Sequence, residues 1–118
     1  LIGSSEWVEE FEKKIAANAI IYINCDLAFI GNYSYEAKAS PLVHNILYSI
    51  TKGIDFDNTT IFNRWLDNKP NIDKTLPKIN SLMGSNSDHT LMLQRAGIPC
   101  IDHRFVNNYV KLFKYFYL

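Results

Sequence analysis

The stretch AIIYINCD, residues 19–26, decides the predicted fold. It is an apolar run that ends on the carboxylate of Asp26. A run this short, placed between a helical pattern and a Gly-Asn turn, is typical of a buried strand in an α/β sheet. Because ligands of such sheets bind outside the carboxyl ends of the strands, Asp26 is the first candidate for chemistry. The alternative is that Asp26 caps the following loop.

The segments around this run complete an α/β pattern. Residues 4–18 carry an apolar stripe at a spacing of four, which predicts an amphipathic helix before the strand. Further helices are predicted at 41–52, 60–66 and 88–96, and a second strand at 98–102. Strand and helix stripes must share one core. The expected core therefore includes Trp7, Phe11, Ile21, Ile23, Leu91 and Ile98.

Composition and charge narrow the possible functions. The chain has 118 residues, of which 47% are hydrophobic and 20% charged, and this is enough for one small domain. The formal net charge is zero, which argues against a nucleic-acid partner or an anionic membrane surface. No apolar run approaches the ~20 residues of a membrane span. Leu1 is not a start methionine, so we expect a piece of a longer protein.

The cysteines and the Asn-X-Ser/Thr sequons are informative about the cellular compartment of the protein. Cys25 and Cys100 fit no zinc or redox spacing, so both are expected to be buried free thiols. Asn32 and Asn58 each begin an Asn-X-Ser/Thr sequon and are candidates for glycosylation. These sequons are compatible with a protein of the secretory pathway.

Two later segments differ in character from the rest. Residues 83–89, MGSNSDH, form a turn of small residues before a predicted helix, and such a turn offers backbone N–H groups to an anionic ligand. Residues 106–118 are rich in aromatic side chains, and their apolar residues follow neither a helical nor a strand spacing. The chain is therefore divided into residues 1–105 and a divergent aromatic tail of unknown structure at residues 106–118.

Six segments, taken in order, resemble motifs of one known family. They are LIGSSEW (1–7), YINCD (22–26), GNYS (31–34), PKI (77–79), GSNSD (84–88) and QRAGI (94–98). Together they resemble the glutamate carboxypeptidase II group, the N-acetylated-alpha-linked acidic dipeptidases. This group is related to the transferrin receptor and lies within the co-catalytic zinc peptidases. The resemblance covers about residues 1–105.

The resemblance implies a fold and a set of site residues. The fold is part of a three-layer helix/sheet/helix zinc-exopeptidase domain, an α/β class with a mostly parallel sheet and two zinc ions at its edge. Asp26 falls on one metal-binding aspartate of the family. The segment Ser85, Asn86 and Ser87 falls on a stretch that lines the substrate pocket, and Arg104 falls on an arginine that recognises acidic substrates.

The same resemblance shows departures from the family. Glu36 and Asp102 stand where the acid-recognising enzymes have further arginines, which puts glutamate specificity in doubt. The family's Glu-Glu pair, with its catalytic base, falls before residue 1, and no histidine follows His103. His89 and His103 match no metal-binding position. We therefore expect no catalytic residue in this chain and an incomplete zinc site.

These expectations define the function predicted from the sequence. The chain is expected to be a fragment of a two-zinc exopeptidase that hydrolyses peptide bonds in its full-length parent, and to be inactive alone. The resemblance also implies a possible homodimer and a membrane-anchored parent with an extracellular or lumenal catalytic domain. One alternative is a non-catalytic, transferrin-receptor-like domain that binds a partner. Another is an unrelated small α/β binding module.

Overall fold

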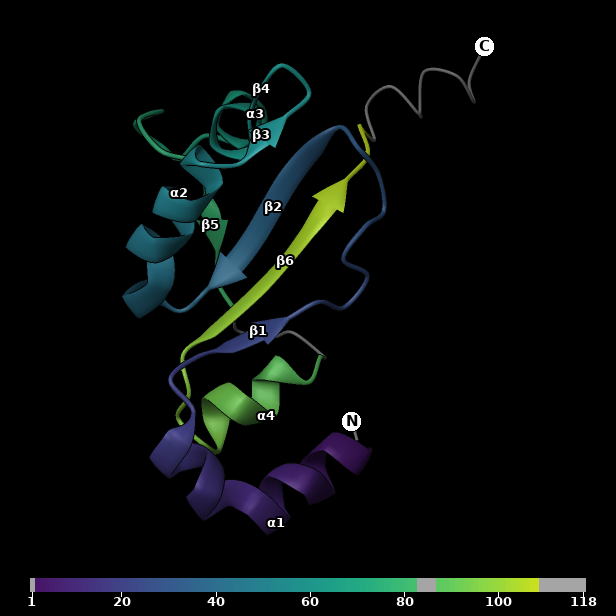
Figure 1. The fold of residues 1–118 in the computed structure, drawn as a ribbon, viewed down its shortest axis with the longest axis vertical. Helices are drawn as coiled ribbons and strands as arrows, with labels where there is room; N and C mark the ends of the chain where they lie inside the picture. Colours follow the sequence, from purple (N-terminus) through teal and green to yellow (C-terminus); the bar gives the residue numbers. More distant parts are fainter. Residues whose placement is uncertain (1, 83–86, 109–118) are drawn as a thin grey trace.

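The computed structural model describes residues 2–82 and 87–108 of the chain (Figure 1). Its helices are α1 (Ile2–Asn18), the short 3-10 turn η1 (Pro41–Val43), α2 (His44–Lys52), α3 (Ile61–Asn68) and α4 (His89–Gln94). Its strands are β1 (Tyr22–Asn24), β2 (Ser34–Ala39), β3 (Asp55–Phe56), β4 (Thr59–Thr60), β5 (Ile79–Asn80) and β6 (Cys100–Val106).

The main sheet has four strands in the order β1-β6-β2-β5 (Figure 1). The pairs β1–β6 and β2–β5 are parallel, whereas the longest pair, β2–β6, is antiparallel. The predicted α/β class is therefore confirmed, and two of the three pairings are parallel. β3 and β4 form a separate two-stranded hairpin. β6 runs to Val106, and residues 109–118 of the predicted tail lie outside the described residues.

Strand β2 was not predicted from the sequence, although its side chains alternate. Tyr35, Ala37 and Ala39 are buried, whereas Glu36 and Lys38 between them are only partly covered. Successive side chains of a strand point to opposite faces of the sheet, so this alternation separates an apolar face from a charged face. The short alanine side chains weaken the hydrophobic signal that would otherwise mark such a strand.

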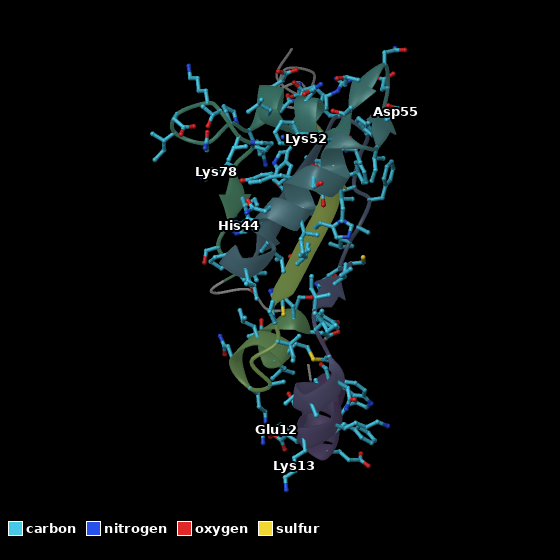
Figure 2. All side chains as sticks on the ribbon, turned by 60° about the vertical axis from the view of Figure 1, so that its left-hand side comes forward. Glu12, Lys13, His44, Lys52, Asp55 and Lys78 are labelled. Carbon is cyan, nitrogen blue, oxygen red and sulfur yellow. The ribbon has the colours of Figure 1, made fainter. Side chains whose placement is uncertain are left out.

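Helices α2 and α3 cover the apolar face of β2 and β6. In Figure 2, the labelled His44 and Lys52 mark the two ends of α2, which lies across the sheet. The Trp65 side chain on α3 is fully buried, and its ring centroid lies 5.1 Å from that of Tyr35 in an edge-on contact. The buried cluster comprises Tyr35, Ala37, Ala39, Val43, Leu47, Ile61, Trp65 and Ile101.

Helices α1 and α4 pack together beside β1 and the start of β6. Arg95, which follows α4, forms ion pairs with Glu9 and Glu12 one turn apart on α1, at 2.6 and 3.2 Å. At the other end of α1, the Ser4 hydroxyl donates a hydrogen bond to the Asp88 carboxylate at 2.6 Å. The buried cluster between these elements comprises Val8, Ile15, Leu82, Met92, Ile98 and Cys100.

The predicted core is wrong for some of the six residues assigned to it. Ile98 is buried, but Trp7 and Ile23 are 49% and 57% exposed. Ile21 packs with the α2/α3 cluster, so the six residues do not share one core. The physical reason is that β1 is an edge strand, with β6 on one side only among the described residues. The prediction of a buried strand at residues 19–26 is therefore wrong: the strand spans Tyr22–Asn24, and within it Asn24 is buried whereas Ile23 is exposed.

The same edge position changes the expected state of one cysteine. Both cysteines are free thiols, and Cys100 is buried as predicted. Cys25 is exposed, because it follows the last residue of the edge strand. Among the described residues, no helix combines the length and the hydrophobicity needed to cross a bilayer.

Candidate functional site

Asp26 lies just beyond the carboxyl end of β1, in a turn where Leu27 has φ 51°. The Asp26 side chain is exposed, and within residues 2–82 and 87–108 its carboxylate has no hydrogen-bond or ion-pair partner. The alternative role as a loop cap therefore finds no hydrogen bond in this part of the chain. A carboxylate at a strand end, free of other partners, is suited to binding a cation.

Two residues earlier, Asn24 connects three separate segments. Its side-chain nitrogen Nδ2 donates to Ser87 Oγ at 2.9 Å and to Asp102 Oδ1 at 2.8 Å. The structure thus brings Ser87, a predicted pocket residue, to the end of the strand that precedes Asp26. Ser85 and Asn86 lie outside the described residues. Asn24 was missed as a site residue, although a polar residue that ends an apolar run is a signal for it.

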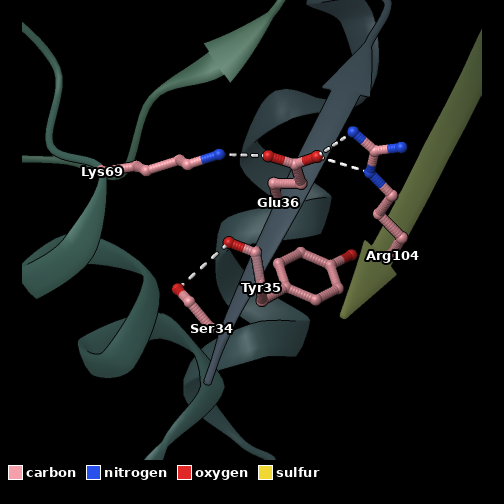
Figure 3. A network of polar contacts seen from close by, with 5 residues as sticks. All are labelled: Ser34, Tyr35, Glu36, Lys69 and Arg104. Atoms are coloured by element: carbon pink, nitrogen blue, oxygen red, sulfur yellow. Dashed lines mark hydrogen bonds and ion pairs between the residues drawn. The ribbon is translucent and has the colours of Figure 1, made fainter. Parts of the chain in front are cut away.

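Arg104 is engaged on the charged face of the sheet (Figure 3). It lies opposite Glu36 in the β2–β6 register, and its guanidinium pairs with the Glu36 carboxylate. Lys69, at the end of α3, pairs with the other carboxylate oxygen of Glu36. Burial by itself raises the pKa of Glu36, but the hydrogen bonds and charges of Lys69 and Arg104 outweigh it and lower the pKa below its usual value.

This network gives a partner to both carboxylates near Arg104, and the doubt about glutamate specificity stays a prediction. The sequence placed two uncompensated carboxylates, Glu36 and Asp102, beside Arg104. In the structure, Glu36 pairs with two cations, Lys69 and Arg104, and together with the Asp102 carboxylate these four side chains carry no net charge. Asp102 in turn accepts the Asn24 hydrogen bond. Lys69 is a contributor that the sequence did not reveal, because it comes from a different element of the fold.

The described residues do not form a complete zinc site. Within residues 2–82 and 87–108, no three His, Cys, Asp or Glu side chains gather closely enough to hold a metal ion. Catalytic zinc takes three protein ligands besides water, and structural zinc takes four. Asp26 fits the role of one ligand, whereas the described set as a whole does not fit a bound zinc ion.

Two histidines lie near this part of the fold without joining Asp26. His103 Nε2 is 3.4 Å from Cys25 Sγ, and burial lowers the His103 pKa, although the charge of Asp102 opposes the shift. His89 is fully buried at the start of α4, and neither of its ring nitrogens has a hydrogen-bond partner in the described part of the chain. That neither histidine replaces a missing family ligand stays a prediction.

The two predicted glycosylation sites lie on the surface. Asn32 and Asn58 are both exposed. Asn58 and Asp57 both have positive φ, 65° and 47°, in the turn between β3 and β4. Asn and Asp tolerate this conformation, which is the one that a two-residue hairpin turn requires. The sequons are accessible, and their glycosylation stays a prediction.

Comparison with known proteins gives relatives named glutamate carboxypeptidase, aminopeptidase NAALADL1 and transferrin receptor. No protein-family model matches the chain. A probable glutamate carboxypeptidase of Arabidopsis thaliana is 31% identical over 112 residues, or 92% of this chain. The glutamate carboxypeptidase 2 homolog of Caenorhabditis elegans is 31% identical over 115 residues, or 91% of the chain. Transferrin receptor protein 2 of Homo sapiens is 24% identical over 110 residues.

The match covers nearly all of this chain but little of its relatives. It spans 16% of the Arabidopsis protein and 15% of the Caenorhabditis elegans protein. The mouse aminopeptidase NAALADL1, at 29% identity, is matched over 14% of its length. The resemblance seen in the six motifs is therefore confirmed, and the chain matches part of a domain of the glutamate carboxypeptidase, NAALADL1 and transferrin receptor group.

Proposed function

We propose that this chain is part of the catalytic domain of a two-zinc exopeptidase that hydrolyses peptide bonds, with Asp26 as one metal-binding carboxylate. The observation that carries the proposal is the exposed Asp26 carboxylate at the carboxyl end of β1, beside a strand end that also holds Ser87 through Asn24. Of the four relatives described above, two are named glutamate carboxypeptidases and one an aminopeptidase.

The proposal assigns to this chain only part of the site. Because the described residues do not complete a zinc site, the remaining ligands and the catalytic base must come from elsewhere in the parent, and no catalytic step through zinc follows from these residues alone. The chain by itself is then inactive. Ser85, Asn86, Ser87 and Arg104 would line the pocket for the peptide.

Three broader features belong to the same proposal. The four-stranded sheet would be part of a three-layer helix/sheet/helix domain in the parent. The parent would be membrane-anchored, with its catalytic domain outside the cell or in the lumen, and would form a homodimer. The non-catalytic alternative is less favoured, since the relative named a transferrin receptor is 24% identical, against 29–31% for those named peptidases.

Transfer of this segment into an active relative tests the proposal. Residues 2–105 would replace the matching stretch of the Caenorhabditis elegans homolog, and hydrolysis would be assayed with dipeptides that have acidic or neutral C-terminal residues. We expect the folded chimera to hydrolyse at least one peptide, and Asp26→Asn to abolish the activity. Asp67→Asn makes the same chemical change at an exposed position on α3 and is the matched control. Full activity in the Asp26→Asn chimera would refute the proposed role.

A further inference from the structure

Asn24 occupies an unusual position for an amide side chain. It is the last residue of β1 and is 4% exposed, although its neighbour Ile23 on this edge strand is 57% exposed. Both of its hydrogen bonds reach segments distant in the sequence, Ser87 before α4 and Asp102 on β6. Asn24 and Asp102 are also direct partners in the parallel β1–β6 register. A buried polar group is costly unless it is hydrogen-bonded, and here both acceptors lie within 2.9 Å.

We propose that Asn24 is a positioning residue that clamps Ser87 and Asp102 against the carboxyl end of β1, and so fixes the edge of the sheet on which Asp26 lies. The role of this clamp in supporting the Asp26 site rests on the proposed function. The hydrogen bonds of the clamp can be tested without a metal ion and without a peptidase assay. An amide has two N–H groups in a fixed planar geometry. Asn24 therefore orients both partners at once, which a single hydroxyl donor at this position would not do.

The chemistry of the clamp suggests a test by reversal. Asn24→Asp removes both donors and places a carboxylate beside Asp102, so the bond to Asp102 is lost and like charges meet, whereas the bond to Ser87 can form only if the hydroxyl becomes the donor. If Asp102→Asn is added, the new amide at position 102 can donate to the new carboxylate at position 24. The Ser87 hydroxyl can then donate to the same carboxylate. The double variant restores both hydrogen bonds with opposite polarity and with the original total charge.

Amide hydrogen exchange by NMR on the full, metal-free chain would measure the clamp. The Thr90 N–H donates to the Ser87 carbonyl at 3.0 Å, and the Leu91 N–H to the Asp88 carbonyl at 3.2 Å, so these two amides report on the clamped segment. We expect Asn24→Asp to accelerate their exchange by about tenfold or more, as the loss of one or two buried hydrogen bonds implies. The Lys69 N–H, bonded to the Trp65 carbonyl at 2.8 Å, should be unchanged. Asn45→Asp, at an exposed position on α2, is the matched control.

The double variant decides between a local clamp and a general structural role. The proposal expects exchange at Thr90 and Leu91 to return to within about threefold of the parent chain. It is overturned if Asn24→Asp leaves these two amides unchanged, if Lys69 is accelerated to the same degree, or if the double variant fails to restore protection. If Asn24→Asp does not fold, a folded and protected double variant supports the clamp, and an unfolded one refutes it. None of these outcomes depends on the peptidase activity of the chimera.

Discussion

Two halves of the molecule, one around α2 and α3 and the other around α1 and α4, differ in the size of their buried clusters and of the side chains at their centres. In the first, Trp65 is fully buried beneath β2 and β6 and contacts two tyrosine rings. In the second, Trp7 on α1 is 49% exposed, and the buried cluster consists of smaller side chains: Val8, Ile15, Leu82, Met92, Ile98 and Cys100. Both halves leave some large apolar side chains exposed, such as Ile20 in the second and Leu42 in the first. The candidate site residues Asp26, Asn24 and Ser87 belong to this second half.

This difference indicates how stability and function are distributed. Stability in a folded domain follows the density of buried apolar contacts, and elements with few of them open more easily. The α2/α3 half should therefore form the stable part of the chain. The α1/α4 half holds the candidate site. Its ion pairs of Arg95 with Glu9 and Glu12 are about half exposed, so they add little to its stability.

The largest effect should come from the centre of the α2/α3 half. We expect Trp65→Ala to lower the free energy of unfolding by about 3–5 kcal/mol, since it removes a fully buried ring. Trp7→Ala makes the same change at a 49% exposed position on α1 and should cost less than about 1 kcal/mol. Urea unfolding followed by circular dichroism measures both. Equal losses of unfolding free energy in the two variants would contradict the difference in stability between the two halves.

A second pair of variants sharpens the comparison within one sheet. Ile101 on β6 and Ile23 on β1 are direct register partners, but Ile101 is 6% exposed and Ile23 is 57% exposed. Ile101→Ala should cost about 2–5 kcal/mol, and Ile23→Ala less than about 1 kcal/mol. Thermal and denaturant unfolding would give both values. A larger loss for Ile23 than for Ile101 would show that β1 is a central strand after all.

A smaller effect concerns the ion network on the charged face. Glu36→Gln should lower the free energy of unfolding by about 1–3 kcal/mol near neutral pH, because it leaves Lys69 and Arg104 without their carboxylate. The folded-state pKa of Glu36 is lowered from its ordinary value of 4.5. Its contribution is therefore fully present above that value and is lost as the pH falls through the folded-state pKa.

The measurement is the difference in unfolding free energy between the parent chain and Glu36→Gln as a function of pH. It should be constant from pH 7 to about pH 5.5 and shrink below the ordinary pKa of 4.5. A difference that grows on acidification would contradict the direction of the pKa shift. Asp67→Asn, an exposed carboxylate on α3, is the control for general charge effects.

The sequence predicted the class of the fold better than its layout. The helices were found because their apolar stripes recur at helical spacing, and Gly97, with φ 68°, follows soon after the end of α4. The edge position of β1 was not visible, because a short apolar run looks the same at the centre and at the edge of a sheet. Likewise, the pairing of Glu36 with Lys69 depends on the tertiary fold, which brings residues 33 positions apart into contact.

For the site, the motif around residues 22–26 singled out Asp26 as a candidate, but the side chains that organise its surroundings came only from the structure. Asn24 was part of a quoted motif without an assigned role, since sequence gives no partner for a buried amide. The contact between Asn24 and Ser87 spans 63 residues. Such long-range polar contacts are set by packing of whole elements, which local patterns do not encode.

The central claim is that this chain supplies one carboxylate to a zinc site that it does not complete. The most direct test is calorimetric titration of the purified chain with Zn²⁺, together with a peptide-hydrolysis assay. The account predicts no hydrolysis and only weak zinc binding, because a single exposed carboxylate does not replace the three protein ligands of a catalytic zinc ion. Submicromolar zinc affinity that disappears in Asp26→Ala, together with peptide turnover, would contradict the account.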